Sequence, residues 1–162
     1  MTAAPGIPFE TTAHVRDACL CLHAQRAARA LARRFDEALR PAGLTNGQFS
    51  LLMALNRPEP APMSEIAVLL GADRTTLTAA LKPLVRRGLA EIGADAGDSR
   101  VRRIALTAEG RARLAAALPH WTSTHAALEA ELADADPARL RRGLLALAGA
   151  PALAACDSRE AP

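Results

Sequence analysis

Apolar residues recur every three or four positions along much of this chain, which is the spacing of amphipathic helices. Between residues 12 and 40 no proline or glycine interrupts the pattern, so it predicts one long helix. Its apolar stripe comprises Leu20, Ala24, Ala28, Leu31, Phe35 and Leu39. Pro41 and Gly43 end this helix, and residues 1–11, which include two prolines and a glycine, are expected to form a flexible arm ahead of it.

Three shorter helical patterns come next. The first begins at a Thr45 cap and ends before the proline-rich segment 56–63. The second covers residues 64–71, and the third runs from about Asp73 to Arg87 with Leu77, Leu81, Leu84 and Val85 as its buried set. A tight Gly-Ala-Asp turn separates these last two, which predicts a helix-turn-helix.

After Gly88 the pattern changes to two short extended segments, LAEIG and RVRRIAL, joined by the turn-rich ADAGDS. This order predicts a β-hairpin over residues 89–106. A helix-turn-helix followed by a basic hairpin is the arrangement of a winged helix, in which the second helix enters the DNA major groove. The hairpin is then the wing.

A further helix is expected to start at Thr107. Apolar and aromatic positions recur along it at the spacing of a helix that packs on a partner helix: Leu114, Leu118, Trp121, His125, Leu128 and Leu132. Pro119 is expected to kink it, and a last helix covers about residues 137–147.

One domain of mainly α class accounts for the 162 residues, which include three Phe, one Trp and no Tyr. Its predicted parts are a winged helix-turn-helix with a two-stranded wing, and N- and C-terminal helices that form a dimerisation region. In order, these are the arm 1–11, the dimerisation segments 12–43 and 107–148, the DNA-binding region 44–106 and a flexible tail 149–162.

Basic residues are concentrated in the winged-helix region. Between Arg74 and Arg113 there are nine Lys or Arg against four acidic residues, although the whole chain carries a formal net charge of only +3. This local excess suits a polyanion. The candidate contacts on the second helix, to phosphates and base edges of double-stranded DNA, are Arg74, Thr75, Thr76, Thr78 and Lys82.

The wing carries the remaining candidate DNA contacts. Asp98 lies two residues before Arg100 and is expected to hold its guanidinium by a charge-assisted hydrogen bond, while Arg102 alternates to the same face. A solvated charged hairpin is the alternative for such a run alone. Its position beside a helix-turn-helix favours the DNA-binding interpretation.

Other functional classes find little support. The sequence shows no nucleophile elbow, phosphate loop or metal-ligand spacing, so we expect no enzyme, metal or cofactor. No signal-type segment or run long enough to span a bilayer is present, which predicts a cytoplasmic, nucleoid-associated protein with no membrane partner. The alternative function is a winged-helix module for protein interaction without sequence-specific DNA contact.

Residues 63–111 resemble the core of the MarR family of transcriptional regulators, through the helix-turn-helix, the RGL entry to the wing, the D-x-R tip and the LT..G exit. The resemblance extends over about residues 12–148. It implies an obligate homodimer on a palindromic operator, usually as a repressor. Pro83 departs from it, because many relatives carry a polar residue there, and leaves the course of the recognition helix beyond Lys82 open.

The resemblance also bears on the cysteines. Cys21 matches the position of the sensing thiol in the organic-hydroperoxide (OhrR-like) branch, but the tyrosines that typically activate that thiol are absent, which leaves His23 or an arginine of a partner as candidates. A buried small hydrophobe is the alternative role for Cys21. On one regular helix Cys19 would face the opposite side and could not bridge to it, and Cys156 is either a resolving thiol or incidental.

A small aromatic or phenolic effector is the other mode of control that the resemblance implies, bound between the dimerisation helices and the winged helix. Trp121 is the leading candidate to line its pocket, together with an arginine that would hold a carboxylate. The other candidates are His14, His23, His120, His125, Arg26, Arg29 and Arg33.

Overall fold

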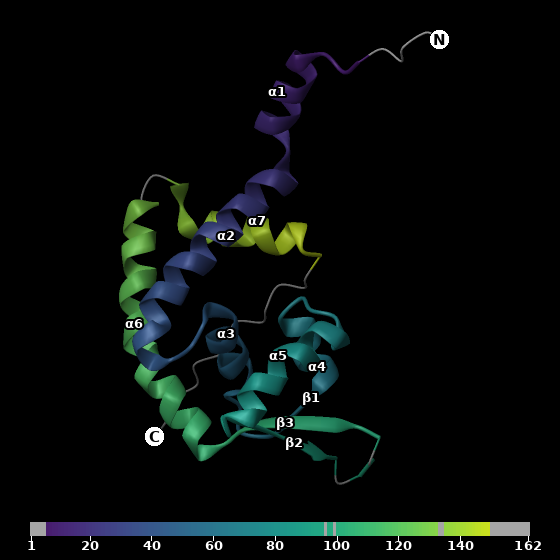
Figure 1. The fold of residues 1–162 in the computed structure, drawn as a ribbon, viewed down its shortest axis with the longest axis vertical. Helices are drawn as coiled ribbons and strands as arrows, with labels where there is room; N and C mark the ends of the chain where they lie inside the picture. Colours follow the sequence, from purple (N-terminus) through teal and green to yellow (C-terminus); the bar gives the residue numbers. More distant parts are fainter. Residues whose placement is uncertain (1–5, 96, 99, 133–134, 150–162) are drawn as a thin grey trace.

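The computed structural model describes residues 6–95, 97–98, 100–132 and 135–149. Over these ranges the chain is mostly helical with one small antiparallel sheet, so the predicted winged-helix class is confirmed (Figure 1). The helices are α1 (Phe9–Ala18), α2 (Leu20–Leu39), a short 3₁₀ helix (Arg40–Ala42), α3 (Asn46–Leu55), α4 (Met63–Leu69), α5 (Arg74–Arg86), α6 (Ala108–Glu131) and α7 (Pro137–Leu147). The strands are β1 (Ala61–Pro62), β2 (Ala90–Ala94) and β3 (Arg102–Leu106).

The expected single N-terminal helix is in fact two helices. The chain is extended at Cys19, where ψ is 103°, and the Cys19 sulfur accepts a hydrogen bond from the Leu22 amide (3.4 Å) as the N-cap of α2. Periodicity does not reveal such a break, because cysteine is not a usual capping residue. Two sequence expectations therefore fail: residues 9–11 are helical rather than part of an arm, and Cys19 and Cys21 do not share one regular helix.

The sequence signals at the ends of the helices in the winged-helix region are confirmed. Thr45 and Gln48 form a reciprocal capping box at the start of α3, and Gly71 takes the left-handed conformation (φ 60°) that closes α4. The recognition helix α5 continues through Pro83 to Arg86, and the Arg87 amide donates to the Pro83 carbonyl (3.2 Å). The proline therefore does not end the helix at Lys82.

The wing belongs to a three-stranded sheet in the order β1-β3-β2, not to an isolated two-stranded hairpin. Ala90 pairs with Leu106 and Ala94 with Arg102, while β1 adds Ala61 opposite Ile104 on the other side of β3. Strand β1 could not be predicted from the pattern, because it is two residues long and ends in Pro62. Proline is tolerated there because β1 is an edge strand.

The core lies where α3, α4 and α5 meet the sheet and α6. Its fully buried side chains are Leu39, Leu51, Leu52, Ile66, Leu77, Leu81, Leu84, Leu89 and Ile104. Trp121 on α6 stacks on Phe49 and Phe35, with ring centroids 6.0 and 6.4 Å apart. The apolar stripe predicted along α6 therefore packs in part on this chain's own core, since Leu114 is buried and Leu128 also packs against the core.

A close junction joins the winged helix to α6. The Thr107 hydroxyl donates to the Gly88 carbonyl (2.5 Å) and accepts from the Gly110 amide (3.0 Å), while the Thr107 amide donates to the Leu89 carbonyl (3.3 Å). Gly110 is buried so tightly that a Cβ atom placed on it would lie 1.9 Å from the Leu89 carbonyl oxygen. That distance explains why the first turn of α6 carries a glycine.

We expect Gly110→Ala to destabilise the protein by about 3 kcal/mol or more, because the methyl group meets backbone that cannot move without separating β2 from α6. Denaturant unfolding followed by circular dichroism measures the change. Gly47→Ala is the matched control, since Gly47 is helical with nothing within 4 Å of an added Cβ, and it should be neutral or slightly stabilising. Equal stability of the two variants would contradict the proposed constraint at Gly110.

Candidate nucleic-acid interface

The N-terminus of the recognition helix is held by a side-chain cap. Asp73 accepts hydrogen bonds from the Thr76 amide (2.7 Å) and the Thr76 hydroxyl (2.8 Å). These bonds favour the ionised carboxylate and hold the pKa of Asp73 below its usual value. The Thr76 hydroxyl is therefore already engaged in the cap, whereas the neighbouring side chains of Arg74 and Thr75 are exposed.

One residue predicted on the polar side of this helix lies elsewhere. Thr78 is half-buried, donates its hydroxyl to the Arg74 carbonyl (2.7 Å) and contacts the Met63 sulfur (3.9 Å). It sits next to buried Leu81 on the helix surface and so faces α4. Lys82 is exposed as expected.

Three predicted basic residues come together around one crevice. A hollow of about 370 Å³ lies between the start of α4, the N-terminal end of α5 and the wing. It is lined by Pro62, Met63, Ser64, Ala67, Arg74, Arg100, Val101 and Arg102. The structure thus places a cation from the recognition helix and two from the wing on the same hollow.

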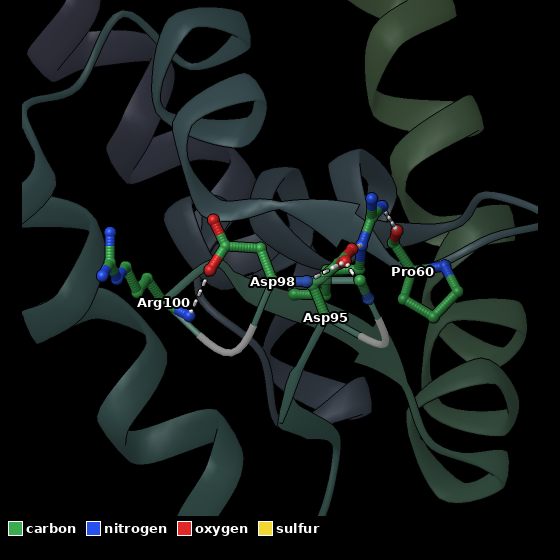
Figure 2. Close-up of polar contacts among 6 residues, drawn as sticks. Pro60, Asp95, Asp98 and Arg100 are labelled. Atoms are coloured by element: carbon green, nitrogen blue, oxygen red, sulfur yellow. Dashed lines mark hydrogen bonds and ion pairs between the residues drawn. The ribbon is translucent and has the colours of Figure 1, made fainter.

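The hydrogen bonding at the wing tip differs from what the sequence predicts. Asp98 accepts a hydrogen bond from the backbone amide of Arg100 (2.9 Å), and the Arg100 guanidinium points away from it (Figure 2). The predicted Asp98 to guanidinium bond is absent between these two described residues. Two residues are enough for a carboxylate to fold back on the chain's own amide, so the short spacing favours the turn over the side-chain pair.

The ion pair of the wing is between Asp95 and Arg103, which sequence reasoning missed. Asp95 also accepts from the Gly97 amide (2.8 Å) and the Asp98 amide (3.1 Å), and Arg103 donates to the Pro60 carbonyl (2.8 Å) (Figure 2). The Arg103 guanidinium, followed by the two amides, holds the pKa of Asp95 below its usual value. This pair depends on the register of β2 against β3, which cannot be inferred from the sequence pattern.

The basic residues between 74 and 113 divide into two groups. Four bond to protein groups: Arg87 to the Gly43 carbonyl (2.9 Å), Arg103 as above, Arg111 to the Leu106 carbonyl (2.9 Å) and Arg113 to Glu109 (3.0 Å). The other five make no side-chain hydrogen bond or ion pair to any residue that the structure describes. They are Arg74, Lys82, Arg86, Arg100 and Arg102.

Comparisons with known proteins decide the family. A sequence model of the MarR family matches residues 42–101. The M. tuberculosis transcriptional regulator MosR, solved in complex with DNA, is 44% identical over 82% of this chain and 95% of its own, with a TM-score of 0.74. This chain belongs to the MarR family.

As a MarR-family member, the chain is a transcriptional regulator with a DNA-binding winged-helix fold. The transcriptional repressor CouR bound to a 23-mer DNA duplex is 28% identical over 90% of this chain and 97% of its own (TM-score 0.66). CouR from Rhodococcus jostii RHA1 bound to p-coumaroyl-CoA matches the fold at 22% identity, 85% and 96% coverage and a TM-score of 0.71. A search of curated proteins found no match.

The thiols of this MarR-family chain lie around the break between α1 and α2. Cys21 is exposed, and Gln25 donates to its sulfur (3.2 Å), so a buried hydrophobe is the wrong description of Cys21 in this single chain. His23 does not approach the Cys21 thiol as a donor; its Nδ1 bonds to the Cys19 carbonyl (2.9 Å). Cys19 is half-buried, and Cys156 lies outside the described residues.

Trp121 lines an apolar crevice of about 410 Å³ between α3, α4 and α6. The other lining residues are Phe49, Ser50, Met53, Ala54, Leu69, Leu70 and Leu118. No arginine or histidine is among them, so this crevice offers no arginine to hold a carboxylate. Arg26, Arg29 and Arg33 lie on α2, away from this lining.

No group of three or more His, Cys, Asp or Glu residues is placed to hold a metal ion within the part of the chain that the structure describes. None of its described helices combines the length and the apolar character needed to cross a bilayer.

Proposed function

We propose that this protein is a homodimeric repressor that reads a palindromic operator, with α5 in the major groove and the wing in the adjacent groove. The observation that supports it most is the hollow lined by Arg74, Arg100 and Arg102, which brings three cations from the recognition helix and the wing together on one part of the surface. The DNA-bound relatives MosR and CouR, the second described as a repressor, agree with this function.

Every candidate contact except Thr78, which faces α4, has a proposed role. Arg100 and Arg102 extend into the narrow groove beside the recognition site, and Arg74 and Lys82 neutralise phosphates or meet base edges. Thr75, whose hydroxyl makes no hydrogen bond to any residue that the structure describes, lies exposed at the helix N-terminus. Thr76 and Asp98 act indirectly, by holding the helix start and the wing turn.

A second copy of the chain is proposed to cover the apolar surface around α1, α2 and α7. Ile7, Phe9 and Leu20 are 79%, 74% and 68% exposed, which is unusual for large apolar side chains clustered at one end. A crevice of about 590 Å³ between α2 and α7 is lined by Leu20, His23, Ala24, Ala27, Ala135, Arg139, Leu140, Gly143, Leu144 and Leu147. A symmetric partner offers the same apolar surface in return.

The salt dependence of DNA binding should distinguish basic residues that make no side-chain bond to a described residue from those that bond to protein groups. Lys82→Gln is expected to weaken operator binding and lower the slope of log affinity against log salt by about 1 to 2 for a dimer, since each phosphate contact releases a counterion. Arg100→Ala should weaken operator binding about ten- to hundredfold. Fluorescence anisotropy on the DNA upstream of the protein's own gene measures both.

Arg87→Gln is the matched control for Lys82→Gln, because it removes the same charge from a side chain that bonds to Gly43 and Gln48. It should lower stability and leave the salt slope unchanged. Equal affinity for operator and random DNA would instead support the alternative, a winged helix that mediates protein interaction.

Two modes of release are proposed, and a separate structural observation supports each. The Cys21 thiol is exposed in the single chain, and a hydroperoxide that reaches it would oxidise it to a sulfenic acid while the peroxide is reduced to an alcohol. The apolar crevice beside Trp121 suits a small aromatic or phenolic compound whose hydroxyl could bond to Ser50.

Stoichiometric organic hydroperoxide should abolish operator binding by the wild type and spare Cys21→Ser, if Cys21 is the switch. Anisotropy before and after oxidant measures this, with Cys19→Ser as the matched control because Cys19 is half-buried. Unchanged binding by the oxidised wild type would reject redox control and leave the crevice as the effector site.

A further inference from the structure

The turn at the wing tip is held by two carboxylates rather than by apolar packing. Asp95 accepts the amides of Gly97 and Asp98, and Asp98 in turn accepts the amide of Arg100. Two backbone hydrogen bonds complete the turn: the Val101 amide donates to the Asp98 carbonyl (2.9 Å) and the Asp95 amide donates to the Val101 carbonyl (3.0 Å). The backbone that carries Arg100 is therefore bonded, through two steps, to Asp95.

Asp95 is anchored in its turn by Arg103 on the central strand β3. The same guanidinium donates to the carbonyl of Pro60 (2.8 Å), which directly precedes β1. Since Pro62 is the N-cap of α4, Pro60 belongs to the segment that leads into the helix-turn-helix. One planar guanidinium thus links the wing turn to the segment that precedes α4, a geometry that suits the rigid fork of arginine.

Arg103 itself faces away from the hollow of the basic residues. Side chains alternate along β3, so Arg102 lines the hollow shared with Arg74 and Arg100, while Arg103 lines a shallow groove on the opposite face with Pro60, Glu91 and Gly93. The ion pair is consequently not placed to contact DNA that lies against the hollow. Any effect that it has on binding must act through the position of the wing.

We propose that Asp95 and Arg103 are positioning residues that fix the wing relative to α5 and so place Arg100 and Arg102 opposite Arg74. This inference rests on the proposed function, because it needs Arg100 to contact DNA. The Arg103 side chain is 38% exposed and that of Asp95 18%, and the pair lies on the wing, outside the fully buried core, so it adds little to global stability. Its loss should therefore disturb the wing without unfolding the protein.

Arg103→Lys tests the linkage without changing the net charge, because an ammonium cannot hold Asp95 and the Pro60 carbonyl with one planar fork. We expect it to weaken operator binding about tenfold, to leave affinity for random DNA unchanged and to leave thermal unfolding nearly unchanged. Asp95→Asn should weaken operator binding in the same way. Glu91→Gln is its matched control, since it removes the same charge from the same hairpin and Glu91 has no ion-pair partner among the described residues.

Combination with Arg100→Ala distinguishes positioning from a general effect. If the pair acts through Arg100, Arg103→Lys should cost much less affinity in the Arg100→Ala background than in the wild type. Full additivity of the two substitutions would overturn the inference, as would wild-type operator affinity in both Arg103→Lys and Asp95→Asn.

Hydrogen exchange separates this inference from the proposed function. The Gly97 and Asp98 amides should exchange faster in Arg103→Lys and at the wild-type rate in Glu91→Gln, whether or not DNA is bound. Faster exchange with unchanged operator affinity would reject positioning while the DNA contact stands. If Arg100→Ala also binds the operator normally, the proposed wing contact itself has failed.

Discussion

The hydrogen bonds of Thr107 fix the recognition helix and the wing relative to α6. Its hydroxyl and amide bond to Gly88 at the end of α5, to Leu89 before β2 and to Gly110 in α6, so three elements meet around one side chain. The approach of Gly110 to the Leu89 carbonyl leaves no room for even a methyl group. Trp121, further along α6, stacks on Phe49 of α3 and Phe35 of α2, so the long helix is bonded to the end of α5 and the start of the wing at one point and packed on α2 and α3 at another.

Hydrogen bonding decides which cations are available to a ligand. Arg87 and Arg113 reach carbonyls of the turn that follows α2, where a helix end leaves acceptors unsatisfied. Arg103 spans the wing and the approach to α4. Fewer positive charges are therefore available at the interface than the count in the sequence suggests. The elements that carry them, α5 and the wing, have backbone amides bonded to Asp73 and Asp95.

Periodic and capping signals in the sequence were sufficient for most of the fold. The Thr45 cap, the turn at Gly71, the buried leucines of α5 and the hairpin all lie where the pattern indicates, because each depends on residues close together in the chain. The break at Cys19 and strand β1 escaped, since one depends on an unusual sulfur cap and the other on pairing with a distant strand. For the site, sequence named Arg74, Arg100 and Arg102 but not the contact between Asp95, Arg103 and Pro60, which requires knowledge of strand register and of a loop some forty residues away.

Hydroxyl-radical footprinting of the protein on the DNA upstream of its own gene tests the central claim most directly, that paired recognition helices and wings read a symmetric site. The expected pattern is two protected half-sites related by a two-fold axis, with centres about one helical turn apart or a multiple of it, and flanking minor-groove protection from the wings. Uniform protection along the fragment, or a single unpaired patch, would contradict a dimeric winged-helix regulator that binds an operator.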